Sequence, residues 1–134
     1  MPIEVYDTAK FAHDTKKRTL VINTNRFHAW IHYYKPDQID EMHCHNQDQT
    51  FTVVEGELTM LFPDGGEAKL GPGMMATITG GSFYQLHNQT DAELIMIGTR
   101  SGSSDKTVKV EYGTGRLITY DRSAAPAEAA AATA

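Results

Sequence analysis

The chain has 134 residues, with 12 Lys and Arg against 17 Asp and Glu, so its formal net charge is −5. This length predicts one domain with a self-sufficient core, and the single cysteine, Cys44, excludes an internal disulfide or a Cys-rich zinc site. The absence of a Lys/Arg stripe and of an apolar run of about 20 residues argues against nucleic-acid and membrane partners. No signal-peptide pattern opens the chain, so we expect a cytoplasmic protein.

In chain order, the first segment, residues 1–17, holds few periodic apolar positions and is predicted to be an irregular N-terminal arm. Short β-branched or aromatic segments bounded by turn residues follow, and they predict strands at residues 18–22, 26–34, 50–55, 57–62, 67–70, 74–79, 83–87 and 92–99. Strands that recur every 8–12 residues or so are typical of an all-β sandwich or barrel.

Residues 101–123 are predicted to form a linker and a C-terminal β-hairpin, with strands at 107–112 and 116–120. An isolated hairpin is marginally stable in water, so it should pack against something else. The last segment, residues 124–134, is alanine-rich with an internal proline and few residues to bury, and we expect a disordered tail.

The strand predicted at 26–34 has two different faces, because successive side chains point to opposite sides. One face carries His28, Trp30, His32 and Tyr34, and the other carries Phe27, Ala29 and Ile31. We favour the interpretation in which the second set packs in the core and the first faces solvent or a partner subunit. The alternative is that His28 and His32 line the mouth of a pocket as acid–base groups.

His43 and His45 are two residues apart, so on a strand their imidazoles share a face while Cys44 points away. Imidazole is the commonest protein ligand for transition metals, so the pair is a candidate metal site. The other interpretation of such a pair is two half-exposed histidines at the end of a strand.

The segment from Asp37 to Gly56 resembles the first motif of the cupin superfamily, G-x5-H-x-H-x3,4-E-x6-G, with Gln49 at the glutamate position. The segment from Gly73 to Asn88 resembles the second motif, G-x5-P-x-G-x2-H-x3-N, with Tyr84 at the histidine position. This resemblance implies a cupin-type double-stranded β-helix, a jelly-roll barrel, over residues 18–100.

The resemblance also implies a ligand set of His43, His45, Gln49 and Tyr84 for a divalent Fe, Zn, Mn or Ni ion. Two of these four residues depart from the family pattern. Tyr84 could bind the metal as a phenolate, but we prefer a neutral phenol that transfers a proton to or from the substrate. Tyr84 is therefore one candidate catalytic residue, and His32, as an acid–base group at the mouth of the pocket, is the other.

By the same resemblance we expect a metal-dependent dioxygenase, lyase or isomerase that acts on a small oxygenated substrate such as a diketone, enol or hydroxy acid. The alternative is a metal-free cupin that binds a small ligand without catalysis. Single-domain cupins commonly form dimers, so a homodimer is also expected.

Overall fold

The computed structural model describes residues 2–118, and within this range nearly all regular structure is β-strand. The strands are β1 (Thr19–Asn23), β2 (Phe27–Tyr34), β3 (His43–His45), β4 (Gln49–Glu55), β5 (Leu58–Leu61), β6 (Glu67–Leu70), β7 (Met75–Ile78), β8 (Gln85–His87), β9 (Leu94–Ser101), β10 (Lys109–Glu111) and β11 (Leu117–Ile118). The helices are α1 (Thr8–Thr15) and a short 3₁₀ turn, η1 (Ser104–Lys106). The all-β class predicted from the sequence is confirmed.

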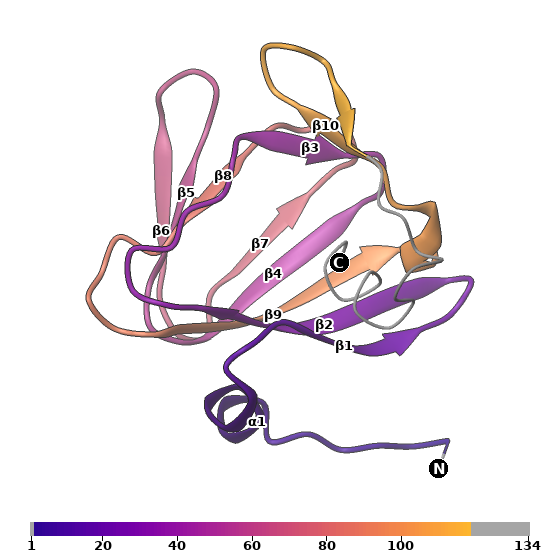
Figure 1. Cartoon of the computed structure of the whole chain (residues 1–134), viewed down its shortest axis with the longest axis vertical. Coiled ribbons are helices and arrows are strands. Elements are labelled where there is room, and N and C mark those ends of the chain that lie inside the picture. The colour runs from indigo at the N-terminus through magenta and orange to yellow at the C-terminus, as the bar shows by residue number, and fades with distance from the viewer. Residues whose placement is uncertain (1, 119–134) are drawn as a thin grey trace.

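The strands form three antiparallel sheets that surround a common interior (Figure 1). The largest sheet has the order β1-β2-β9-β4-β7, and the two smaller sheets have the orders β6-β5-β8 and β11-β10-β3. A reciprocal pair of backbone hydrogen bonds between His43 and Tyr84, each 2.9 Å long, connects β3 to the segment that leads into β8. The walls of the barrel therefore meet at the two residues that the sequence had placed in one site.

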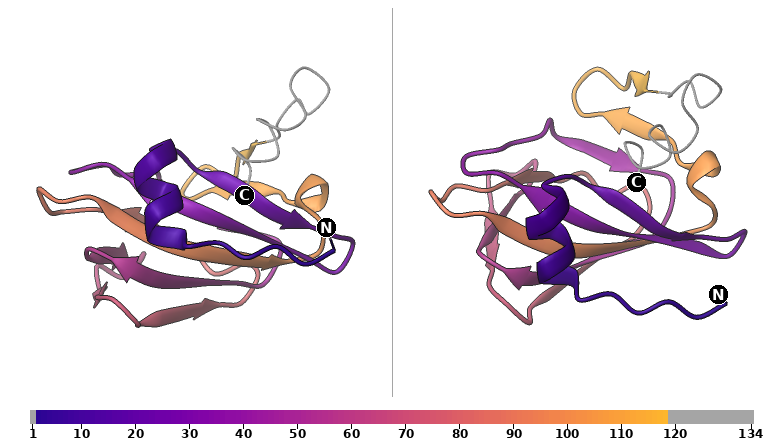
Figure 2. Two further views of the ribbon diagram at one scale, coloured as in Figure 1. Left: turned by 90° about the horizontal axis from the view of Figure 1, so that it is seen from below. Right: turned by 60° about the horizontal axis from the view of Figure 1, so that its bottom comes forward.

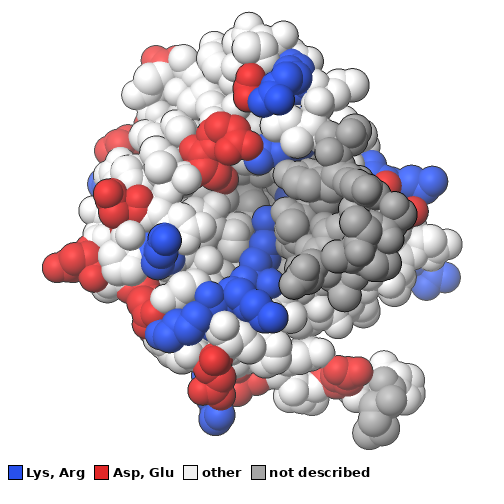
Figure 3. Space-filling model, viewed as in Figure 1, with Lys and Arg blue, Asp and Glu red and all other residues white. Residues whose placement is uncertain are grey.

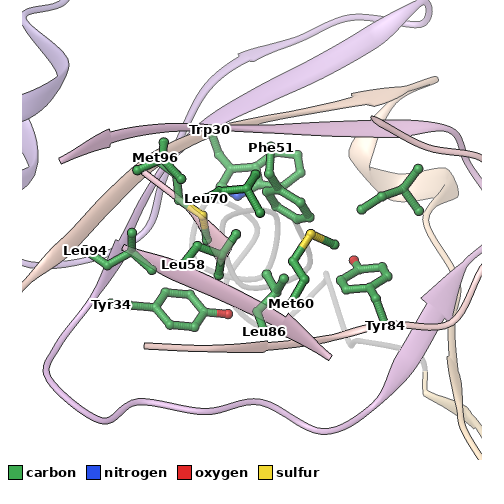
Figure 4. Packing of buried hydrophobic residues seen from close by; sticks show 12 residues of the cluster. Trp30, Tyr34, Phe51, Leu58, Met60, Leu70, Tyr84, Leu86, Leu94 and Met96 are labelled. Atoms are coloured by element: carbon green, nitrogen blue, oxygen red, sulfur yellow. The ribbon is translucent and has the colours of Figure 1, made fainter. Parts of the chain in front are cut away.

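The core fills this interior with the large side chains that the alternating strands turn inward (Figure 4). Trp30 is fully buried, and its ring lies where a side chain at Gly98 would stand, because a Cβ there would be 2.2 Å from the ring. Glycine on β9 is therefore what makes room for the tryptophan on the neighbouring strand β2.

The favoured orientation of β2 was wrong. His28, Trp30, His32 and Tyr34 are all buried, and Trp30 and Tyr34 belong to the barrel core. The opposite face of β2 packs Ile31 beneath the N-terminal helix. Alternation groups the side chains of a strand correctly, but it does not say which group faces inward.

The N-terminal arm was also predicted incorrectly, since residues 8–15 form helix α1. Asp7 caps this helix by accepting a hydrogen bond from the Lys10 amide, and Lys16 ends it in a left-handed conformation. Ala12 packs with Ile31 and Ile95 on the outer face of the large sheet, where Figure 2 shows the helix lying across the strands. The stability of a helix this short comes from such packing, which the local sequence does not reveal.

The predicted C-terminal hairpin is confirmed where the structure describes it, because β10 pairs antiparallel with β11. Its other neighbour is β3, with Lys109 opposite His45 and Glu111 opposite His43. The hairpin thus completes a wall of the barrel. The second hairpin strand beyond residue 118 and the tail at 124–134 lie outside the described residues. Neither helix in residues 2–118 has the length and apolar character that crossing a membrane would require.

Candidate functional site

A cavity of about 450 Å³ is lined by residues from six strands of the barrel, β2, β3, β4, β8, β9 and β10, and by Tyr84 just before β8. In the view of Figure 3 the surface is hollowed at its centre. His43 and His45 both line this cavity, together with Tyr84 and His32. The structure therefore brings together in one cavity four of the residues singled out from the sequence.

The two histidines of β3 are held in one orientation by backbone carbonyls. The Nδ1 atom of His43 lies 2.6 Å from the Glu41 carbonyl oxygen, and Nδ1 of His45 lies 3.2 Å from that of Val108. A carbonyl can only accept, so each Nδ1 carries the proton and each Nε2 has a free lone pair when the ring is neutral. Burial lowers the pKa of His43 to about 4 and holds the pKa of His45 well below its usual value, so both rings are neutral near pH 7.

Tyr84 lies directly opposite His43, so the two side chains share a face and their ring centroids are 4.8 Å apart. The hydroxyl of Tyr84 accepts a hydrogen bond from Gln49 Nε2 at 2.6 Å. Burial raises the pKa of Tyr84 to about 12, although the nearby Arg100 acts in the opposite direction. The phenol is therefore neutral and keeps its own proton available to a bound molecule.

Gln49 is committed to protein partners at both ends of its amide. Arg100 Nε donates to Gln49 Oε1 at 2.9 Å, and because a guanidinium can only donate, this contact assigns the amide oxygen to Arg100 and the amide nitrogen to Tyr84. The oxygen that the resemblance assigned to a metal is therefore engaged by a cation.

Two members of the expected four-residue metal set, Gln49 and Tyr84, are hydrogen-bonded to other side chains in this arrangement. Within residues 2–118 no cluster of three or more His, Cys, Asp or Glu side chains is placed to hold a metal ion, so a metal bound by His43 and His45 would need a ligand of another kind. The Gln49 oxygen that the resemblance offers for this purpose already accepts a hydrogen bond from Arg100. The four-residue set stays a prediction, in which His43 and His45 are the two members with a free Nε2 lone pair.

Asp40 is a site residue that the sequence analysis did not single out. Its carboxylate accepts hydrogen bonds from the Leu86 amide at 2.8 Å and from the Tyr34 hydroxyl at 3.1 Å, and it lines the cavity. Burial raises the pKa of Asp40 to about 6. No local pattern could have marked it, because its partners come from β2 and β8.

His32 lines the cavity and is 6% exposed, and its Nδ1 has no hydrogen-bond partner among the described residues. Burial, followed by the charges of Arg18 and Arg100, holds its pKa well below the usual value. His28 does not line the cavity, and its Nδ1 lies 2.9 Å from the Gly102 carbonyl oxygen. Of these two histidines, the structure brings only His32 to the site.

Basic side chains dominate the charged part of the lining. The cavity is lined by Lys16, Lys17, Arg18, Lys35, Arg100 and Lys109. Asp40 is the one acidic side chain among the described residues that line it. Figure 3 shows Lys and Arg side chains gathered beside the hollow. Lys16, Lys17 and Arg18 are consecutive in the sequence, whereas Lys35, Arg100 and Lys109 come from three separate segments.

Similar folds occur among solved structures. An uncharacterized conserved protein with a double-stranded β-helix domain from Klebsiella pneumoniae is 18% identical, with a TM-score of 0.65, over 87% of this chain and 96% of that protein. KdgF from a Halomonas species is 20% identical, with a TM-score of 0.58, over 63% of this chain and 76% of KdgF. A salicylate 1,2-dioxygenase from Pseudaminobacter salicylatoxidans is 19% identical, with a TM-score of 0.62, over 69% of this chain and 32% of the enzyme.

Identities this low show a shared fold and nothing about activity. No protein with a curated description is significantly similar to the chain in sequence. The cupin domain family, however, matches residues 30–98, which is more than half of the chain and includes most of β2, all of β3 to β8 and most of β9. On the motifs, the barrel and this match together, the chain belongs to the cupin superfamily.

Proposed function

We propose that this chain is an enzyme of the isomerase or lyase kind, which moves a proton on a small oxygenated substrate such as an enol, a diketone or a hydroxy acid. The observation that carries the proposal is that one cavity holds two acid–base groups with opposite protonation near neutral pH. Asp40, with a pKa of about 6, is ionised, and Tyr84, with a pKa of about 12, is protonated. Groups whose pKa values are separated in this way are typical of an acid–base pair in an active site.

In the proposed step, the Asp40 carboxylate removes a proton from the carbon next to a carbonyl group. The C–H bond breaks and its electron pair moves through the new C=C bond to the carbonyl oxygen, which becomes an enolate. Tyr84 donates its hydroxyl hydrogen to that oxygen as a hydrogen bond. Where the substrate carries a hydroxyl group on the deprotonated carbon, the hydrogen of that hydroxyl moves to the enolate oxygen and Asp40 returns its proton to the former carbonyl carbon, which completes an isomerisation.

Neutral His43 and His45 have unprotonated Nε2 atoms that can accept hydrogen bonds from substrate hydroxyl groups, and this would orient a hydroxy acid or an enol. His32, neutral and buried at the same cavity, would exclude water from one side. The cavity volume of about 450 Å³ suits a molecule of this size.

The test is the exchange of substrate C–H protons with solvent deuterium. NMR would measure this exchange as the loss of the C–H signals of 1,3-diketones, 2-keto acids and 2-hydroxy acids in D₂O. The wild-type chain should accelerate exchange in at least one of these classes. Asp40→Asn should abolish the acceleration, while Asp37→Asn, at an exposed acid that contacts His87, should preserve it. Equal exchange with Asp40→Asn and wild type would rule out the proposed base.

A metal-dependent dioxygenase is the second candidate. It is favoured by one observation, the anchoring of both Nδ1 atoms by backbone carbonyls, which leaves two Nε2 donors for a divalent Fe, Zn, Mn or Ni ion. Elemental analysis of protein purified without chelator, with oxygen uptake measured on the same substrates, distinguishes the candidates. Stoichiometric metal with oxygen consumption would support the dioxygenase and contradict the metal-free route. A cytoplasmic location, a homodimer and the lack of nucleic-acid or membrane partners stay predictions from the sequence.

A further inference from the structure

Arg100 occupies a position in the barrel that the pairing of three strands defines. On β9 it lies opposite Gln49 of β4 and opposite His28 of β2. Directly opposed residues share a face, so these side chains all point into the barrel interior. Arg100 is 2% exposed, and the centre of its guanidinium lies 4.6 Å from the centroid of the Trp30 ring. A buried guanidinium is costly to desolvate, so the groups around it must compensate its charge.

The hydrogen bond that Arg100 donates orients two neighbouring polar groups. Its Nε fixes the Gln49 oxygen, and the other end of the Gln49 amide then turns to the Tyr84 hydroxyl. Arg100 therefore orients two residues of the ligand set that the cupin motifs imply.

The lining of the cavity is positively charged, although the chain as a whole is negatively charged. The chain carries a formal net charge of −5, whereas its cavity is lined by six Lys and Arg side chains and one acidic residue. Lys16 is paired with Glu93, and Lys109 with Glu41. For Lys17 and Lys35, at the exposed side, the described residues provide no ion pair. A basic cleft in an acidic protein concentrates anions.

We propose that the positive charge of Arg100 stands in for a metal ion in this cavity, and that the cavity recognises a small carboxylate. The proposal deepens the proposed function, because it selects the acids among the oxygenated substrates considered above. The carboxylate lies at the inner part of the cavity, against Arg100, while Lys17 and Lys35 at the exposed side attract it from solution. The carbon that carries the acidic proton then faces Asp40. Guanidinium and ammonium groups bind carboxylates by charge-assisted hydrogen bonds, which are stronger than neutral ones.

The test compares malonate, a dianion, with malonamide, its uncharged counterpart, by calorimetric titration of the full chain after treatment with EDTA. Malonate should bind and malonamide should not. Arg100→Met should weaken malonate binding by about 10-fold or more, because a lost charge-assisted contact of about 1.4 kcal/mol corresponds to that factor. Arg100→Lys should restore most of the binding. Arg26→Met, which removes the same charge from the exposed turn between β1 and β2, should leave it unchanged.

The same Arg100→Met variant should gain affinity for Zn²⁺ by about 10-fold or more, since it frees the Gln49 oxygen and removes a repulsive charge. If Arg100→Met does not fold, the double variant Lys17→Met and Lys35→Met tests the exposed basic side instead, and it should weaken malonate binding while circular dichroism stays native. The proposal is overturned if malonate and malonamide bind alike, or if both sets of variants bind malonate as tightly as wild type.

Failure of the proposed function gives a different result. Asp40→Asn should still bind malonate. If the wild-type chain binds malonate but exchanges no C–H protons, the result supports the carboxylate site and contradicts the acid–base mechanism. If the wild-type chain exchanges the protons of neutral diketones but does not bind malonate, the result supports the mechanism and contradicts the carboxylate site.

Discussion

Gln49 and Arg100 face each other across the β4–β9 pair, and the guanidinium Nε donates a 2.9 Å hydrogen bond to the amide oxygen. Gln49 stands at the glutamate position of the cupin motif, and this contact determines which group its side-chain oxygen binds. A carboxylate would present two negatively charged oxygens, whereas the amide has a single neutral oxygen, which Arg100 engages, and a nitrogen that donates to the Tyr84 phenol. The chemistry of the cavity follows from this pair.

Replacing Gln49 with leucine should destabilise the fold. Both Arg100 Nε and the Tyr84 hydroxyl would lose a partner inside the barrel, and a buried polar group left unsatisfied costs about 1–3 kcal/mol. Urea unfolding followed by circular dichroism would measure the change in the free energy of unfolding. Gln89→Leu, at an exposed amide that contacts Lys69, should change it by less than about 0.5 kcal/mol. Equal stabilities would show that the buried network contributes nothing.

Gly98→Ala should destabilise the barrel although it adds only one methyl group. The added Cβ would lie 2.2 Å from the Trp30 ring, so Trp30 or β9 must move, and overpacking of this kind costs about 1–3 kcal/mol. Gly71→Ala is the matched control, because nothing lies within 4 Å of its Cβ position. Thermal unfolding and Trp30 fluorescence would report the difference. An unchanged melting temperature for Gly98→Ala would contradict the packing described here.

Proton exchange catalysed by the chain should depend on pH through Asp40. Its pKa is raised to about 6, and the base must be ionised, so the rate should rise as the pH increases through about 6 and level off above it. Initial exchange rates between pH 4 and pH 8 would define this curve. Tyr84→Phe should lower the plateau but leave the midpoint near 6. A rate that falls with increasing pH would contradict the role of Asp40.

The stability of the fold should decrease in acid because of His32. Its pKa in the folded state is well below the usual value of about 6.5 in an unfolded chain, so below that pH the unfolded state binds more protons. The contribution is therefore fully present above about pH 6.5 and is lost as the pH falls below it. His32→Gln should show a smaller loss between pH 7 and pH 5, measured by urea unfolding. His87→Gln, outside the cavity, should behave as wild type. Asp40 has a raised pKa and opposes this trend equally in all three proteins.

A homodimer is expected, and the C-terminal hairpin is the surface on which to test it. Leu117 of β11 is 62% exposed and Tyr112 is 46% exposed. The alternative surface considered from the sequence, the face of β2 with His28, Trp30 and His32, is buried inside the barrel and cannot serve. Light scattering should give the mass of a dimer, and Leu117→Lys should shift the chain towards monomer. If light scattering gave the mass of a monomer for the wild-type chain, the homodimer prediction would be wrong.

The sequence by itself determined the fold class, the positions of most strands and the convergence of His43, His45 and Tyr84. Period-two alternation and turn residues are local signals, and the two glycine-framed motifs place the histidine pair and Tyr84 on neighbouring strands. Pairing of His43 with Tyr84 then brings their side chains to one face of the barrel wall.

Only the tertiary structure decided which face of β2 is buried, that residues 8–15 form a helix, and that the Gln49 oxygen accepts a hydrogen bond from Arg100. Each of these depends on a partner far away in the sequence: Gly98 for Trp30, Ile31 and Ile95 for Ala12, and Arg100 for Gln49. Asp40 became a candidate base for the same reason, since burial between β2 and β8 raises its pKa. Local periodicity encodes which side chains share a face, whereas burial and charge are created by segments that meet only when the barrel closes.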